Sequence, residues 1–218
     1  MPKNTFSILK FSGVNVQLFL QGQLTCDMTL LSEHGQASLA AVCDHRGRMI
    51  ANFWVVNWHN NFLCILSKSL STLVSDHLKK YAVFSKVTIS EENDFFMTES
   101  DDENTIKIVD KNIMIPDCKQ RIKNGIAILC DKTSLLFTPQ MINLEKLGGV
   151  SFTKGCYVGQ EIVARTQHLG KLKKHLHRLQ IQSDHPLHPG WEIENGVIVE
   201  AANITENNYD VLAVMQDQ

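Results

Sequence analysis

Residues 154–161 carry the sequence Lys-Gly-Cys-Tyr-Val-Gly-Gln-Glu, or KGCYVGQE in one-letter code. Two glycines stand on either side of Cys156, so the backbone there has access to conformations that are closed to other residues. A helix is expected to begin near Gly159, which places the thiol ahead of a helix N-terminus and two residues from Lys154. A helix dipole and a nearby cation both favour a thiolate, so Cys156 is a candidate reactive thiol.

The same stretch carries further groups that are able to contact a ligand. Tyr157 supplies an aromatic face and a hydroxyl, while Gln160 and Glu161 supply an amide and a carboxylate. Glu161 and Arg165 are four residues apart and share a helix face, where an exposed ion pair is the simpler interpretation. Residue types alone therefore indicate no more than a reactive thiol in a ligand cleft.

The composition is that of an ordinary globular protein. The chain has 218 residues, 44% of them hydrophobic and 20% charged, with a formal net charge of -2. Proteins that bind nucleic acid over their whole surface are usually basic, so that class is disfavoured. No apolar run approaches the ~20 residues that span a bilayer, and the N-terminus lacks a secretory signal. We expect a soluble cytoplasmic protein without membrane contact. Its cysteines lack C-x-x-C spacing, so we expect no metal site.

Strand and helix patterns alternate along the first three quarters of the chain. Strands are expected over 36–42, 48–57, 61–66, 87–89, 95–97, 106–109 and 113–115. A helix is expected over 70–81, and Asp117 is expected to cap another that ends at Gly125. Thr138 followed by Pro139 predicts a helix over 138–147. This interleaving predicts the α+β class.

The last part of the chain changes to short strands divided by proline and glycine. They are expected over 176–181, 191–193, 197–204 and 211–214. We expect this stretch to form a small β unit of its own.

The octapeptide 154–161 is similar to the K-G-C-Y-x-G-Q-E signature of the YgfZ family, and it fills every specified position. YgfZ proteins are relatives of the glycine-cleavage T-protein, an aminomethyltransferase that uses tetrahydrofolate. The stretches 137–140, 143–144 and 147–152 before the octapeptide and 162–165 after it also resemble the family, as do 19–27 and 47–49. The resemblance is strong over 138–175, moderate over 11–60 and weak between them.

The resemblance implies a protein that binds tetrahydrofolate or a derivative and supports iron–sulfur cluster assembly or repair. Implied partners are cluster assembly proteins and iron–sulfur enzymes, including those that modify tRNA. The implied α+β fold is T-protein-like, with a folate-binding region of two intertwined lobes over 1–170. Residues 171–218 would form a C-terminal β-barrel-like unit too short to close. Such a unit leaves an open strand edge that a second copy or another protein could cover.

The resemblance also implies site residues. Those that would line or brace the folate cleft are Lys154, Tyr157, Glu161 and Arg165. Cys156 would be the reactive thiol. Gln140 falls where T-protein relatives have a glutamate that grips the pterin, and an amide is able to pair with the same edge. By charge alone, Arg48 and Lys171 are candidate partners for the glutamate tail of folate.

Ala51 falls where T-protein relatives have the catalytic aspartate, and an alanine cannot hold a reacting amine. Independent turnover is therefore not expected, and a folate-dependent aminomethyl- or methyltransferase is the alternative enzyme hypothesis. A third hypothesis is an interaction module with a vestigial pocket, which docks through the open strand edge or the basic run 171–178. That run could make weak contacts with RNA phosphates, although a solvated surface is the simpler interpretation.

Overall fold

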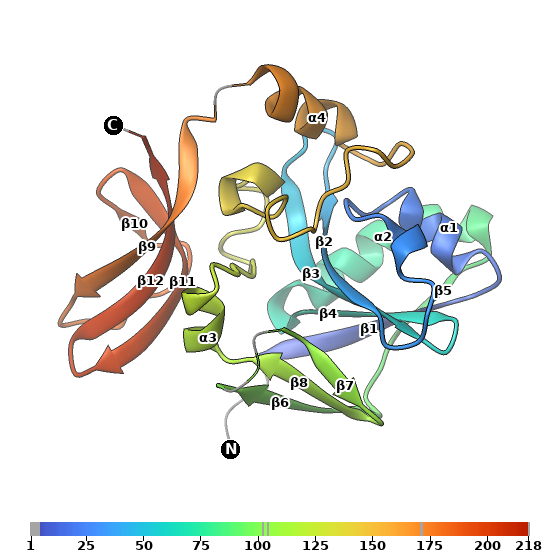
Figure 1. Ribbon diagram of the computed structural model, residues 1–218, viewed down its shortest axis with the longest axis horizontal. Helices are drawn as coiled ribbons and strands as arrows, with labels where there is room; N and C mark the ends of the chain where they lie inside the picture. Colours follow the sequence, from blue (N-terminus) through green and yellow to red (C-terminus); the bar gives the residue numbers. More distant parts are fainter. Residues whose placement is uncertain (1–4, 102, 104, 171, 218) are drawn as a thin grey trace.

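The computed structural model describes residues 5–217 apart from 102, 104 and 171. Three sheets occupy successive parts of the chain (Figure 1). The strands are β1 (Phe6–Ser12), β2 (Ala37–Cys43), β3 (Met49–Trp58), β4 (Asn61–Ser67), β5 (Thr88–Glu91), β6 (Phe96–Ser100), β7 (Lys107–Val109), β8 (Asn112–Pro116), β9 (Lys174–Gln182), β10 (Glu192–Ile193), β11 (Gly196–Thr205) and β12 (Asn208–Gln216). The α-helices are α1 (Val16–Gln21), α2 (Ser71–Ser85), α3 (Cys118–Lys123) and α4 (Gln160–Leu169), and the 3-10 helices are η1 (Met28–Leu30), η2 (Lys68–Leu70) and η3 (Pro139–Ile142).

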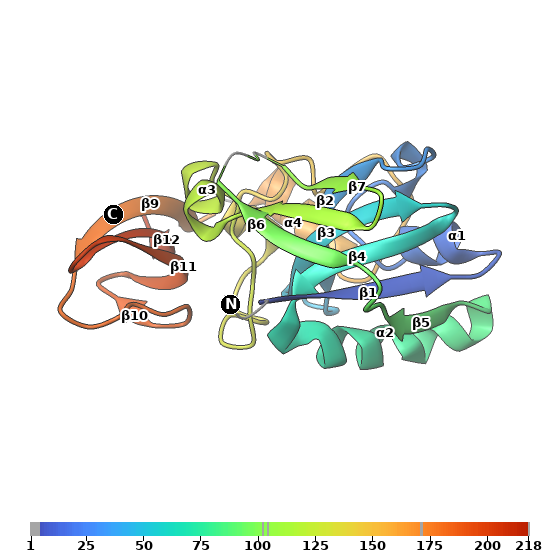
Figure 2. The same ribbon diagram turned by 90° about the horizontal axis from the view of Figure 1, so that it is seen from below.

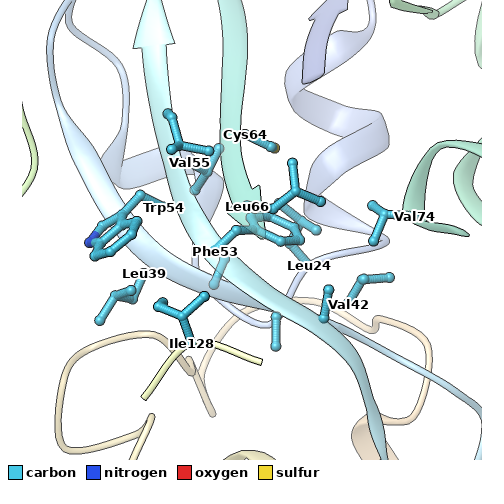
Figure 3. Packing of buried hydrophobic residues seen from close by; sticks show 14 of the residues in the cluster. Leu24, Leu39, Val42, Phe53, Trp54, Val55, Cys64, Leu66, Val74 and Ile128 are labelled. Carbon is cyan, nitrogen blue, oxygen red and sulfur yellow. The ribbon is translucent and has the colours of Figure 1, made fainter. Parts of the chain in front are cut away.

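The largest sheet has the strand order β2-β3-β4-β1-β5. Its strands β1 to β4 are mostly buried on both faces, whereas the edge strand β5 is largely exposed. Successive side chains of a strand point to opposite faces, so Phe53 and Trp54 of β3 face different layers. Figure 3 shows Trp54 and its neighbour Leu39 on the side of Ile128, a residue of the segment that crosses that face. Helix α2 packs with Val74 against the other layer. The predicted strands over 36–42, 48–57 and 61–66 are confirmed as β2, β3 and β4.

The turn between β2 and β3 is fixed by its own side chains. The Asp44 carboxylate accepts the backbone N–H groups of Arg46 and Arg48 at 2.9 Å each. Gly47 has φ +70°, a backbone conformation that favours glycine. The turn is therefore a rigid corner at one end of the sheet.

Two smaller sheets complete the fold. The sheet β6-β8-β7 lies below the main sheet, and the sheet β10-β11-β12-β9 forms the separate C-terminal layer (Figures 1 and 2). Asp117 caps α3 by accepting the Gln120 N–H at 2.7 Å, as predicted. Arg121 of α3 is ion-paired with Glu200 of β11 at 3.1 Å, and both side chains are buried. This pair joins α3 to the C-terminal sheet.

The helix predicted over 138–147 is wrong. Only the 3-10 helix Pro139–Ile142 forms, and turns follow it up to Gly149. Asn143 has φ +57°, a left-handed conformation in which a right-handed helix cannot continue. Within the described residues, no helix combines the length and the apolar character that crossing a membrane requires.

Candidate ligand site

Lys154 of the octapeptide points into the protein. Its Nζ donates hydrogen bonds to the backbone carbonyls of Leu24 and Cys26, both at 2.7 Å, and lies 5.1 Å from the ring centre of Tyr157. Burial lowers the pKa of the Lys154 amine to about 8. Thr25, which lies between Leu24 and Cys26, makes a second link to this region, because its hydroxyl donates to the Gly149 carbonyl at 2.6 Å. Lys154 therefore braces the octapeptide against the loop after α1.

Gly159 and Tyr157 are the other inward-facing members of the octapeptide. Gly159 has φ +82° and packs against the β2–β3 turn, where a Cβ would stand 2.4 Å from the Asp44 carbonyl oxygen. Tyr157 is buried, and burial raises the pKa of its phenol. Within the described chain its hydroxyl has no hydrogen-bond partner. These contacts set α4 directly on the rigid corner of the main sheet.

The remaining members of the octapeptide region face outward. Cys156 is exposed, and α4 begins four residues after it, at Gln160. Arg165 donates to Glu161 at 2.8 Å, and their side chains are 62% and 81% exposed. Glu161 and Arg165 therefore form an exposed ion pair with each other on one face of α4.

Gln140 is buried in η3 and links it to α4. Its Nε2 donates to the Val163 carbonyl at 2.7 Å. Its Oε1 is buried and, among the described residues, has no hydrogen-bond partner. Gln140 also lines a small pocket of ≈ 190 Å³ together with Thr166 and His175. A buried acceptor without a donor is suited to a ligand that brings an N–H group.

Arg48 lies in an open hollow of ≈ 710 Å³, where the β2–β3 turn, the loop before η3 and the start of β9 meet. Its lining residues are Asp44, Arg46, Arg48, Leu135, Leu136 and Lys174. The Asp44 carboxylate is already bonded to the turn backbone, whereas three cations line the same space. Such a surface is suited to carboxylate or phosphate groups, which cations bind through charge-assisted hydrogen bonds. We call these six residues the cationic hollow.

The apolar wall of the cationic hollow is held in place by β3. The Leu135 N–H donates to the Met49 carbonyl at 2.8 Å, and the Arg48 guanidinium donates to the Leu136 carbonyl. Leu135 has φ +62° and is 47% exposed. Non-glycine residues held in the left-handed backbone region cluster at functional sites. The hollow thus places an apolar surface beside the cations.

An uncharged pocket of ≈ 450 Å³ lies at the other end of β2 and β3. Trp54 forms part of its wall, and Ser38 and Thr105 supply hydroxyl groups. Asn52 is buried in β3, and both polar atoms of its amide are hydrogen-bonded: Nδ2 donates to the Ala127 carbonyl at 2.7 Å, and Oδ1 accepts from the Leu129 N–H at 2.8 Å. The adjacent Ala51 is completely buried. Neither residue offers a carboxylate to a reacting amine.

The structure thus separates the residues that the sequence grouped together. Arg48 lines the cationic hollow, Gln140 lines the pocket beside it, and Lys154 and Tyr157 lie behind them as packing residues. Lys171 lies outside the described residues. Sequence reasoning missed Arg46, Leu135 and Leu136, and it assigned Lys174 only to a basic run. The one signal for the hollow was the pair of arginines on either side of Gly47.

No group of three or more potential metal-binding side chains was found in the residues that the structure describes. Cys26, Cys43 and Cys64 are buried, and their surroundings disfavour the thiolate form that binds metals and reacts. Burial raises the pKa of Cys26 and of Cys43 to about 12, and it also raises the pKa of Cys64.

The fold has a known counterpart. The aminomethyltransferase T of the glycine cleavage system from Bartonella henselae matches 97% of this chain with a TM-score of 0.63, over 76% of its own length. The sequence identity is 12%, so this likeness shows the fold. It confirms the predicted T-protein-like α+β class. No family model matches the chain.

Relatives that are similar in sequence identify the family to which the chain belongs within this fold. The tRNA-modifying protein YgfZ of Colwellia psychrerythraea is 30% identical over 87% of this chain and 74% of its own length. The YgfZ protein of an Enterobacter species is 28% identical over 97% of this chain and 83% of its own length. An uncharacterized protein of Haemophilus influenzae is 31% identical over 91% of this chain and 82% of its own length. This chain belongs to the YgfZ family. The Enterobacter alignment runs over 282 positions against 218 residues here, so that relative has segments without a counterpart in this chain.

Proposed function

We propose that this protein binds tetrahydrofolate or a derivative and acts as an accessory protein for iron–sulfur-dependent enzymes, including enzymes of tRNA modification. The cationic hollow carries the proposal. Folate joins an apolar, aromatic body to carboxylates, and the hollow joins Leu135 and Leu136 to Arg46, Arg48 and Lys174. The names of the YgfZ relatives support the link to tRNA modification.

Individual groups have distinct roles in this proposal. Arg48 and Lys174 bind the carboxylates, and the leucines pack against the ring system. The unpartnered Gln140 Oε1 accepts an N–H of the pterin. The octapeptide holds η3 and α4 in place, with Lys154 and Tyr157 inside and Glu161 and Arg165 at the rim.

The proposal includes the division into residues 1–170 and 171–218. The first unit supplies most of the ligand site, and the second supplies one wall through Lys174. Ligand binding would therefore depend on how the two units are joined.

Independent aminomethyl transfer does not follow from this site. That reaction needs a group to hold the reacting amine, and Ala51 and the engaged amide of Asn52 supply none. The ligand would instead act as a bound cofactor. Either another enzyme uses its carbon unit, or its presence fixes the conformation of this protein. Iron–sulfur enzymes, or the proteins that assemble their clusters, would contact the protein in this state.

Calorimetric titration of tetrahydrofolate tests the proposal. We expect binding to the wild type and at least tenfold weaker binding, about 1.4 kcal/mol, to Arg48→Ala. Lys79→Ala is the matched control, since Lys79 is an exposed cation on α2 outside the hollow. Loss of binding in Ser38→Phe, which fills the uncharged pocket, with normal binding in Arg48→Ala would reject the cationic hollow as the site.

A further inference from the structure

The strand β9 forms one margin of the C-terminal sheet. It pairs with β12 over its whole length, from Lys174 to Gln182, in an unbroken antiparallel register. In the sheet order β10-β11-β12-β9 it is the last strand, and Figure 2 shows it as the outer margin of that layer. The opposite margin, β10, has two residues. Only β9 therefore offers a long edge in this sheet as far as the structure describes it.

The hydrogen bonds at the two ends of β9 show which backbone groups face outward. Asp217 donates to the Lys173 carbonyl, and Ser183 donates to the Asn207 carbonyl, both at 2.9 Å. Hydrogen-bonded and non-hydrogen-bonded pairs alternate along an antiparallel ladder. Odd-numbered residues of β9 are therefore bonded to β12. The N–H and C=O groups that point away belong to Lys174, Leu176, Arg178, Gln180 and Gln182.

Part of this edge is open. The start of β9 lies beside η3, and His175 shares a pocket with Gln140. From Leu176 to Gln182, no backbone bond to any described residue other than those of β12 is found. Natural edge strands are usually protected by proline, a bulge, short length or charged side chains, lysine above all. Strand β9 has nine residues and neither proline nor bulge, and its one lysine, Lys174, is its first residue, at the end that lies beside η3. We propose that the β9 edge pairs with the same edge of a second copy of this chain.

The charges on the edge favour an identical strand. Arg178 is already paired with Asp210, with its Nε 2.9 Å from Oδ1. Apart from His177 and the paired Arg178, the open segment consists of uncharged residues, Leu176, Leu179, Gln180, Ile181 and Gln182. A strongly acidic or basic partner strand would gain little from such an edge, whereas an identical edge meets no repulsion.

One register satisfies both the backbone and the side chains. A two-fold axis must place outward-facing residues opposite outward-facing residues, and centring it on Leu179 does so. Arg178 then faces Gln180 of the partner subunit, and Leu176 faces Gln182 of the partner subunit. The two copies of Leu179 meet on the axis. Centring on Arg178 would oppose two arginines, and centring on Gln180 would pair only residues 178–182 instead of the whole open segment. Centring on His177 would need Lys174, which lies at the end of β9 beside η3.

Charge substitutions at Gln180 test the register without removing a backbone group. Gln180 is exposed, but it lies opposite the buried Asp210 within its own sheet, so thermal unfolding of both variants is measured alongside. Gln180→Glu places two carboxylates opposite arginines and should tighten the dimer by roughly 2- to 30-fold, and Gln180→Lys should weaken it similarly. Sedimentation equilibrium over a concentration series measures the effect. Equal dimerisation by both variants would overturn the register.

A proline substitution tests the pairing itself. Gln180→Pro removes an outward N–H that β12 does not use, and proline is tolerated at edge positions of this kind. We expect it to be monomeric with the thermal unfolding of the wild type, while Gln180→Ala, which keeps the N–H, still dimerises. Amide hydrogen exchange of the wild type should slow at Arg178 and Gln180 as the protein concentration rises.

Three results would overturn the proposal. A wild type with the mass of one chain at every concentration excludes the pairing. Undiminished dimerisation of Gln180→Pro places the contact elsewhere on the molecule. Protection of the β9 amides only on addition of a different protein assigns the edge to that partner.

Discussion

Gly159 is in direct contact with the Asp44 carbonyl oxygen, so closely that a Cβ on this glycine would stand 2.4 Å away. The contact joins the octapeptide to the β2–β3 turn that carries Arg46 and Arg48. Because φ of Gly159 is +82°, an L-residue there is strained as well as crowded. The octapeptide therefore shapes the ligand site mainly from behind.

Gly159→Ala should destabilise the protein by about 2–4 kcal/mol, since it combines a left-handed backbone with a clash against backbone atoms. Urea unfolding followed by circular dichroism measures this. Gly155→Ala is the control, because a Cβ at Gly155 meets none of the described atoms within 4 Å. Equal stability of the two variants would refute the structural role of Gly159.

The buried amine of Lys154 should give the stability a specific dependence on pH. Burial lowers its pKa to about 8, whereas an unfolded chain has an ordinary lysine pKa of about 10.4. Between these values the unfolded chain holds more protons, so stability rises with pH. Lys154→Met lacks this contribution. The wild-type-minus-variant difference in unfolding free energy should therefore increase from about pH 8 to about pH 10.4.

Urea titrations of both proteins at several pH values provide the test. A difference that stays flat across the window would mean that the Lys154 amine keeps an ordinary pKa in the folded protein.

The protein should be sensitive to the removal of one partner from the buried Arg121–Glu200 pair. Glu200 also accepts the Ile128 N–H at 2.9 Å and a weaker bond from the Cys118 thiol. Glu200→Gln leaves a buried guanidinium without its counter-charge and should cost about 3–5 kcal/mol. Replacing both Arg121 and Glu200 by leucine should recover part of this loss. A double variant less stable than Glu200→Gln would contradict the account.

Cys156 should be the first cysteine to react with iodoacetamide. It is exposed, whereas burial raises the pKa of the Cys26, Cys43, Cys64 and Cys118 thiols. Peptide mass spectrometry over a time course identifies the modified thiol, and Cys156→Ser should remove the fast phase. Faster labelling of Cys130 would argue against a reactive thiol in the octapeptide.

Parts of this fold could be predicted from the sequence because local signals determine them. The helix expected from Gly159 to Gly170 is confirmed as α4, and Asp117 caps α3 as expected. The strand β1 was missed, since Phe6–Ser12 is a short, mostly apolar run that could belong to either type of element. The pairing that makes it a strand, with β4 and β5, comes from far along the chain.

The site was harder to predict for the same reason. The octapeptide was conspicuous because of its residue types, but two of its candidate ligand-binding residues, Lys154 and Tyr157, are packed inside. The cationic hollow combines residues about 40 and 90 positions apart in the chain, which no local pattern reveals. The roles of Gln140, Glu161 and Arg165 in ligand binding stay predictions.

The most direct test of the central claim compares two ligands, tetrahydrofolate and tetrahydropteroate, which lacks the glutamate tail. If the cationic hollow binds the tail, the wild type should prefer tetrahydrofolate by at least tenfold, and Arg48→Ala should bind the two ligands about equally. Calorimetry on the four combinations gives the coupling between Arg48 and the tail. A wild type that binds both ligands equally, or an Arg48→Ala variant that keeps the full preference, would contradict the account.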